Sequence, residues 1–156
     1  MRLATFAVSC LVASTSWAQN PVWLEGMTDE VYSITVYHSE TCGCCKAWID
    51  HLEQHAFDVT SYPSEDMGAV KQRYGVPAQA ASCHTAIVDE LVVEGHVPAT
   101  DIKRVLNRSD VPQLLTVPGM PSGSPGMDFA GARMDPFAVY AVTGDQVSVV
   151  EQYSGE

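Results

Sequence analysis

The stretch VYSITVYHSETCGCCKAWIDHL, residues 31–52, sets the expected fold and holds three of the five cysteines of the chain. Residues 31–38 are rich in β-branched and aromatic side chains, which predicts a strand. From Cys44 onward the apolar residues recur at intervals of three and four, which predicts an amphipathic helix. A strand followed by a helix places Cys42, Cys44 and Cys45 at the helix N-terminus.

Strand and helix patterns continue toward the C-terminus. Four further elements are expected: a strand over 56–62, a helix over 65–74, a hairpin over 85–97 and a helix over 99–108. Ser64 and Thr100 are the expected capping residues of the two helices, and Gly75 is the expected end of the first. The order β-α-β-α-β-β-α is that of a thioredoxin-like α/β fold, in which helices flank a small mixed sheet.

The C-terminal part of the chain differs in composition. VPGMPSGSPGM, residues 117–127, combines Pro, Gly and Ser with two methionines and predicts a loop. Residues 137–153 alternate around the turn signal Thr143-Gly144-Asp145 and predict a hairpin. We therefore divide the chain into a signal peptide (1–18), a lead-in (19–30), a thioredoxin-like domain (31–107) and an extension (108–156) that packs on this domain.

The first 18 residues, MRLATFAVSCLVASTSWA, have the form of a secretory signal. One arginine precedes an uncharged apolar stretch, and the segment ends on the small-x-small pattern Ser16-Trp17-Ala18. The stretch is too short, and too often broken by Ser and Thr, for a transmembrane anchor. Cys10 lies in this segment and is interpreted as a filler residue. We expect export to the periplasm, where disulfides are permitted.

The formal charge of −11 and the scattered basic residues argue against nucleic acid as a partner. An acidic surface favours the approach of cations, although solubility alone explains it.

The cysteines that remain after signal removal are Cys42, Cys44, Cys45 and Cys83. A helix N-terminus stabilises a thiolate, which is both the attacking group of a thiol-disulfide catalyst and a soft metal ligand. A catalyst would use Cys42 and Cys45 in C-x-x-C spacing and would leave Cys44 superfluous. A structural disulfide framework would cross-link little chain, because three of the four cysteines lie within one turn.

A metal site uses this crowding of sulfurs. Zinc sites usually draw paired ligands from two arms, whereas the second arm here offers only Cys83 and His84. An iron-sulfur cluster would have to be acquired after export. Sulfur ligands select Cu(I), so copper is the best match. In a thioredoxin-like fold the loop that carries Cys83 faces the C-x-x-C turn, and all four thiols are expected to converge.

Three segments, residues 39–52, 75–98 and 117–127, together resemble the exported copper-resistance proteins of the CopG type, a thioredoxin-like family. The resemblance extends over about residues 31–140. It implies periplasmic copper binding by the clustered cysteines, and a multinuclear Cu(I) site with a redox role is one arrangement that it allows. Carried onto this chain, its motifs fall on Cys42, Cys44, Cys45, Cys83, His84, Met120 and Met127. The expected partners are copper ions and other periplasmic copper-handling proteins.

The methionines and histidines leave alternatives open. Met120 and Met127 are interpreted as thioether ligands of Cu(I) or as plugs that hold the loop on the core. His84 is expected to point away from Cys83, as a ligand or as a hydrogen-bonded residue of the sheet. The other four histidines are interpreted as structural: His38, His51, His55 and His96. His51 and His55 lie four residues apart on the predicted helix, but the glutamate that follows the first histidine of a metalloprotease motif is absent.

Three functions remain open from the sequence. The first is a periplasmic protein that binds Cu(I) through the four cysteines in copper resistance. The second is a thiol-disulfide oxidoreductase that uses Cys42 and Cys45. The third, a copper oxidoreductase that cycles Cu(I) and Cu(II), joins the other two, and the sequence does not separate copper storage from electron transfer.

Overall fold

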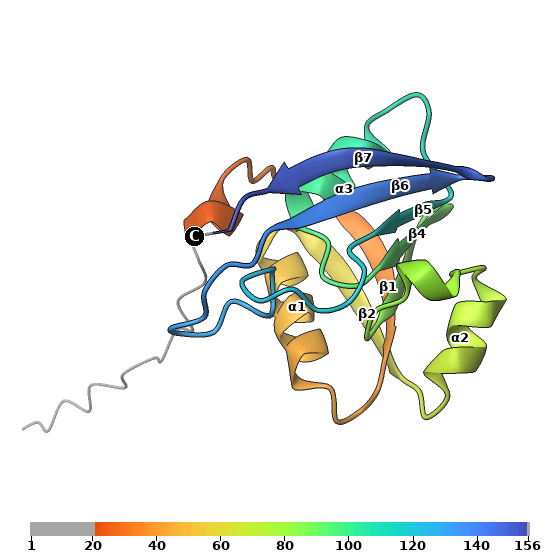
Figure 1. The fold of residues 1–156 in the computed structure, drawn as a ribbon, viewed down its shortest axis with the longest axis horizontal. Coiled ribbons are helices and arrows are strands. Elements are labelled where there is room, and N and C mark those ends of the chain that lie inside the picture. Colours follow the sequence, from red (N-terminus) through yellow and green to blue (C-terminus); the bar gives the residue numbers. More distant parts are fainter. Residues whose placement is uncertain (1–20, 156) are drawn as a thin grey trace, which may run out of the picture.

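A computed structural model describes residues 21–155 (Figure 1). Residues 1–20 and 156 lie outside the described residues, and with them the expected signal peptide and Cys10. The strands are β1 (Tyr32–His38), β2 (Phe57–Pro63), β3 (Thr85–Val88), β4 (Leu91–Glu94), β5 (Leu114–Thr116), β6 (Phe137–Thr143) and β7 (Gln146–Tyr153). The helices are α1 (Gly43–Gln54), α2 (Met67–Arg73) and α3 (Ala99–Leu106), with the short 3-10 helices η1 (Pro21–Leu24) and η2 (Ala78–Ala80).

The seven strands within residues 21–155 form one mixed sheet in the order β2-β1-β3-β4-β5-β6-β7. Parallel pairs join β1 to β2 and β4 to β5, and the other neighbours are antiparallel. The expected mixed α/β architecture and the expected order of elements up to α3 are confirmed. The name thioredoxin-like stays a prediction.

The sequence did not predict β5. This strand has three residues, too few for a hydrophobic period to be recognised, and it forms because β4 and β6 pair with it on both sides. Through β5 the C-terminal hairpin of β6 and β7, which the sequence did predict, continues the sheet (Figure 1).

The core lies between the central strands and the apolar faces of α1 and α3. Trp48 and Leu52 of α1 are fully buried, as are Ile102 and Val105 of α3. Burying a side chain of this size stabilises the fold by about 1.5–3 kcal/mol, so the helix stripes fix α1 on the sheet. The N-terminus of α1, which carries the cysteines, is positioned by this packing.

Two expected helix caps are wrong. The cap of α2 is Asp66, whose Oδ1 accepts from the backbone N–H of Ala69 at 2.9 Å, and not Ser64. The cap position of α3 is Pro98, so Thr100 lies inside the first turn. Proline already fixes φ for the start of a helix, which a search for Ser or Thr caps overlooks. Gly75 follows α2 with φ of +68°, as its role as a helix end requires.

No helix within residues 21–155 is both long and apolar enough to cross a membrane.

Candidate metal centre

The first arm of the centre is the turn between β1 and α1. Cys42 occupies the N-cap position of α1, and its Sγ accepts from the backbone N–H of Cys45 at 3.3 Å. The structure joins Cys42 and Cys45 in a disulfide. Cys44 is a free thiol whose Sγ lies 3.5 Å from Sγ of Cys42. The turn therefore presents three sulfurs at the N-terminus of one helix.

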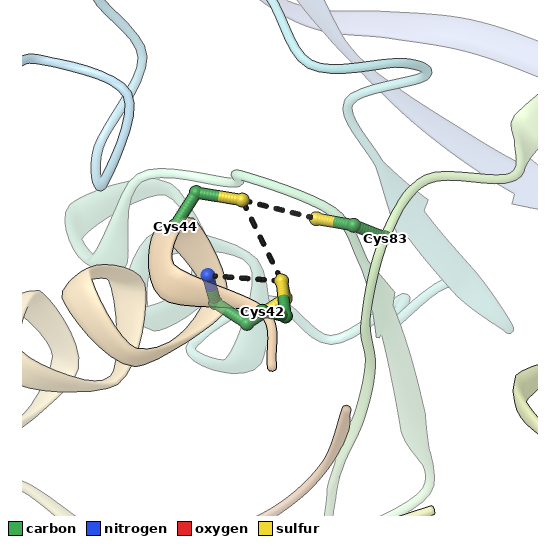
Figure 2. Close-up of side chains that lie close together, drawn as sticks. Cys42, Cys44 and Cys83 are labelled. Carbon is green, nitrogen blue, oxygen red and sulfur yellow. Dashed lines mark hydrogen bonds between the residues drawn. A yellow bond between two sulfur atoms is a disulfide. The ribbon is translucent and has the colours of Figure 1, made fainter. Parts of the chain in front are cut away.

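The second arm is the segment between η2 and β3, which carries Cys83. Figure 2 shows its thiol pointing toward Cys44, and the two sulfurs are 3.9 Å apart. The four sulfurs of Cys42, Cys44, Cys45 and Cys83 all lie within 4.8 Å of one another. The four sulfurs therefore converge as the sequence predicted. Sulfurs this close together are within reach of one metal ion or of a small cluster.

Two histidines extend the donor set beyond the four sulfurs. Nδ1 of His84 lies 3.2 Å from Sγ of Cys83, and Nε2 of His96 lies 3.1 Å from the same sulfur. The other nitrogen of each ring bonds a backbone carbonyl, that of Gly95 or of Pro125. Since a carbonyl only accepts, that nitrogen carries the proton, and the nitrogen facing Cys83 in the neutral ring keeps its lone pair.

The expected orientation of His84 is therefore wrong, because its ring contacts Cys83. The segment is not regular strand there: β3 begins only at Thr85, so the alternation of side chains does not apply to Cys83 and His84. His96 is also more than the hydrogen-bonded loop residue that the sequence suggested. The signal that could have found it is EGHVP, in which Gly95, with φ of +75°, turns the chain back after β4.

Burial favours the uncharged forms of Cys83, His84 and His96 in the absence of metal. Desolvation, and then the neighbouring Cys44, raises the pKa of the Cys83 thiol to about 12. Desolvation also lowers the pKa of His84 well below its usual value, and that of His96 to a lesser degree. A bound cation would favour the Cys83 thiolate and the neutral imidazoles. The three groups are therefore better suited to bind a metal ion than to hold a free thiolate.

The loop over residues 117–127 covers both arms, and it contains neither helix nor strand, as predicted. The backbone N–H of Gly119 donates to the carbonyl of Ala81, and the hydroxyl of Ser82 donates to the carbonyl of Gly119. At the other end, a Cβ on Gly126 would lie 2.8 Å from the carbonyl oxygen of Cys44. Met120 is exposed and Met127 is half-buried in this loop.

The remaining histidines have structural partners. The ring of His38 contacts the hydroxyl of Ser61 and the carbonyl of Ser39. His55 bonds the carbonyls of His51 and Trp23, and Nε2 of His51 accepts from the backbone N–H of Ala99. These contacts agree with the structural interpretation of all three.

A family model described as a protein of unknown function, DUF411, matches residues 80–127. Two solved structures, forms 1 and 2 of "Copper resistance protein copG", are each 47% identical in sequence with a TM-score of 0.75. The matches cover 81% and 80% of this chain and 100% and 99% of the solved chains. No curated protein matches the sequence.

We predict that Gly126→Ala destabilises the protein more than Gly131→Ala. Both glycines have positive φ, so both substitutions introduce a similar backbone strain. Only at position 126 would the new Cβ meet α1, 2.7 Å from the nitrogen of Trp48, and this overpacking should add about 1–3 kcal/mol. Urea unfolding of the two variants measures the difference, and equal losses would show that the loop does not rest on α1.

We also predict that the metal-free protein loses stability as the pH falls, in part through His51. Burial, and then the nearby His55, lowers the pKa of His51 to about 3. The unfolded chain binds a proton near pH 6.5, so between that pH and about 3 unfolding takes up one proton, worth about 1.4 kcal/mol per pH unit. His51→Gln keeps an acceptor for Ala99 and should reduce this slope by one proton in urea titrations, whereas an unchanged slope would contradict the assignment.

Proposed function

Because the chain belongs to the family of the copper resistance protein CopG, we propose that it binds copper as Cu(I) in the periplasm and serves copper resistance. The observation that carries this proposal is the approach of four cysteine sulfurs within 4.8 Å of one another. The periplasmic location rests on the signal-like residues 1–18.

The chemistry of the donors favours Cu(I) over harder cations. Thiolate and thioether ligands are soft, and the centre has four cysteines with two loop methionines, Met120 and Met127, in its cover. His84 and His96 add neutral nitrogen donors beside Cys83. Binding through all four sulfurs first needs reduction of the Cys42–Cys45 disulfide, which takes two electrons and two protons. The thiols then release their protons to the solvent as copper binds.

Charge balance favours more than one copper ion per chain. Four thiolates around a single Cu(I) would leave a net charge of −3 in a partly buried site, and an uncompensated charge there is costly. Several Cu(I) ions that share the thiolates would reduce that charge, and close sulfurs can bridge two metals. We therefore propose a multinuclear site.

Copper analysis after anaerobic purification of the reduced protein tests the proposal. We expect more than one copper per chain, removable by a Cu(I)-specific chelator. Retention of zinc, or of no metal at all, would contradict it.

The Cys42–Cys45 disulfide at the N-terminus of α1 favours a second candidate, a thiol-disulfide oxidoreductase. Catalysed reduction of a model disulfide that survives strict removal of copper would support this activity. A rate that appears only with copper bound would instead support a copper oxidoreductase that cycles Cu(I) and Cu(II).

Cys83→Ser should lower the copper content about as much as Cys45→Ser. Each variant loses one soft donor that a hydroxyl cannot replace, although the two residues come from different arms. Metal analysis and chelator competition on the reduced variants measure the effect. Unchanged copper affinity in Cys83→Ser would rule out a site that uses both arms.

The double variant Met120→Leu/Met127→Leu should bind copper more weakly while the copper-free protein keeps near-native stability. Leucine replaces methionine at a cost of under about 1.5 kcal/mol but offers no sulfur. Met27→Leu, at an exposed position of the lead-in, is the matched control and should change neither quantity. If copper affinity is unchanged in the double variant, the methionines are not ligands.

A further inference from the structure

Glu94, the last residue of β4, has a fully buried carboxylate. Its Oε1 accepts from the backbone N–H of Ser82 at 2.6 Å and from Nζ of Lys71 at 2.6 Å. Its Oε2 accepts from the hydroxyl of Thr85 at 2.6 Å. Two of these three partners, Ser82 and Thr85, closely flank Cys83 in the chain.

The residues after Glu94 hold the same arm. Gly95 donates its N–H to the carbonyl of His84 and accepts from the ring of His84 through its own carbonyl, and His96 contacts Sγ of Cys83. A Cβ on Gly95 would lie 2.6 Å from the Cβ of Ser82. Residues 94–96 therefore lie directly against residues 82–84, with polar contacts at every position.

A buried carboxylate is an expensive way to stabilise a hairpin. Removing an ion from water costs several kcal/mol, which a partner such as Lys71 offsets only with good geometry, and an apolar pair of similar volume is often as stable. What the carboxylate does that an apolar side chain cannot is accept the N–H of Ser82, one residue before Cys83. This N–H lies in the segment ahead of β3, where the ladder between β3 and β4 has not yet begun.

We propose that Glu94, with Lys71 of α2 as its counter-ion, is a positioning residue that holds Cys83 within reach of Cys44. The inference rests on the proposed function for its importance, since copper binding by both arms requires that approach. In this role Glu94 does not contact the four sulfurs itself. It acts through the backbone of Ser82.

The test separates positioning from stability with two double variants of equal charge. Lys71→Met/Glu94→Gln removes both charges and keeps an amide oxygen that can accept from Ser82. Lys71→Met/Glu94→Leu removes the same charges and offers no acceptor. Asp101→Asn is the remote control, because Asp101 is also a buried carboxylate but bonds Tyr153 and Arg104 instead.

Each is made in a Cys42→Ser/Cys45→Ser background, which leaves Cys44 and Cys83 as the pair to be probed. Phenylarsine oxide joins two close thiols with loss of one water, so its affinity measures their approach without copper. We expect the Gln variant and Asp101→Asn to bind it as the background does. The Leu variant should bind at least about tenfold more weakly, the effect of one lost hydrogen bond to a buried group.

Equal affinity of the Gln and Leu variants would overturn the proposal, and so would a comparable loss in Asp101→Asn, which would attribute the effect to stability alone. Cu(I) affinity is then measured with all four cysteines restored, where the Leu variant should again be the weaker. If the otherwise unsubstituted protein retains no copper while the arsenical result holds, the proposed function fails and the positioning role of Glu94 stands.

Discussion

The burial of Trp48 is the contact on which the geometry of the centre depends. Its ring lies against that of His84, with centroids 4.3 Å apart, and its indole N–H donates to the carbonyl of Val97 at 2.9 Å. The loop over residues 117–127 rests on the backbone of Trp48 at Gly126. Through its side chain and its backbone, Trp48 thus contacts the segment that carries Cys83, the chain after β4 and the loop over the site, so these parts cannot shift independently.

Near Trp48 the protein buries several polar groups. Glu94, His84 and His96 are each fully buried, and each has hydrogen-bond partners within the site. An apolar core tolerates small displacements, whereas a buried polar group loses hydrogen-bond energy when the distance or angle to its partner changes. These buried polar residues therefore restrict the position of the segment that carries Cys83 more tightly than apolar packing alone would.

The sequence predicted those parts of the fold that local patterns determine. The strand-helix unit that carries Cys42 and the terminal hairpin have clear periods, and both are observed. It missed β5, which depends on two neighbouring strands, and it misplaced the cap of α3, where Pro98 takes the position expected of a polar residue. These errors arise where tertiary pairing or backbone geometry outweighs side-chain preference.

The candidate site shows the same division. Cys44 and Cys83 could be brought together from sequence because the expected fold places their two loops opposite each other, and their sulfurs lie 3.9 Å apart. His96 was missed although Gly95 in EGHVP indicates a turn before it, because its position at Cys83 also depends on the carbonyl of Pro125, far along the chain. A metal-ligand spacing in the sequence identifies donors on one element, whereas a donor that reaches the site through a turn and a distant backbone contact gives only a weak local signal.

The disulfide and the proposed four-sulfur copper site are alternative states of the same atoms. While Cys42 and Cys45 are bonded to each other, neither is a thiolate, and only Cys44 and Cys83 remain as thiol donors among the described cysteines. Those two, with His84 and His96, still offer two sulfurs and two nitrogens from both arms. In the proposed copper site, reduction would therefore change a mixed donor set to one dominated by sulfur, which favours the softer oxidation state of copper.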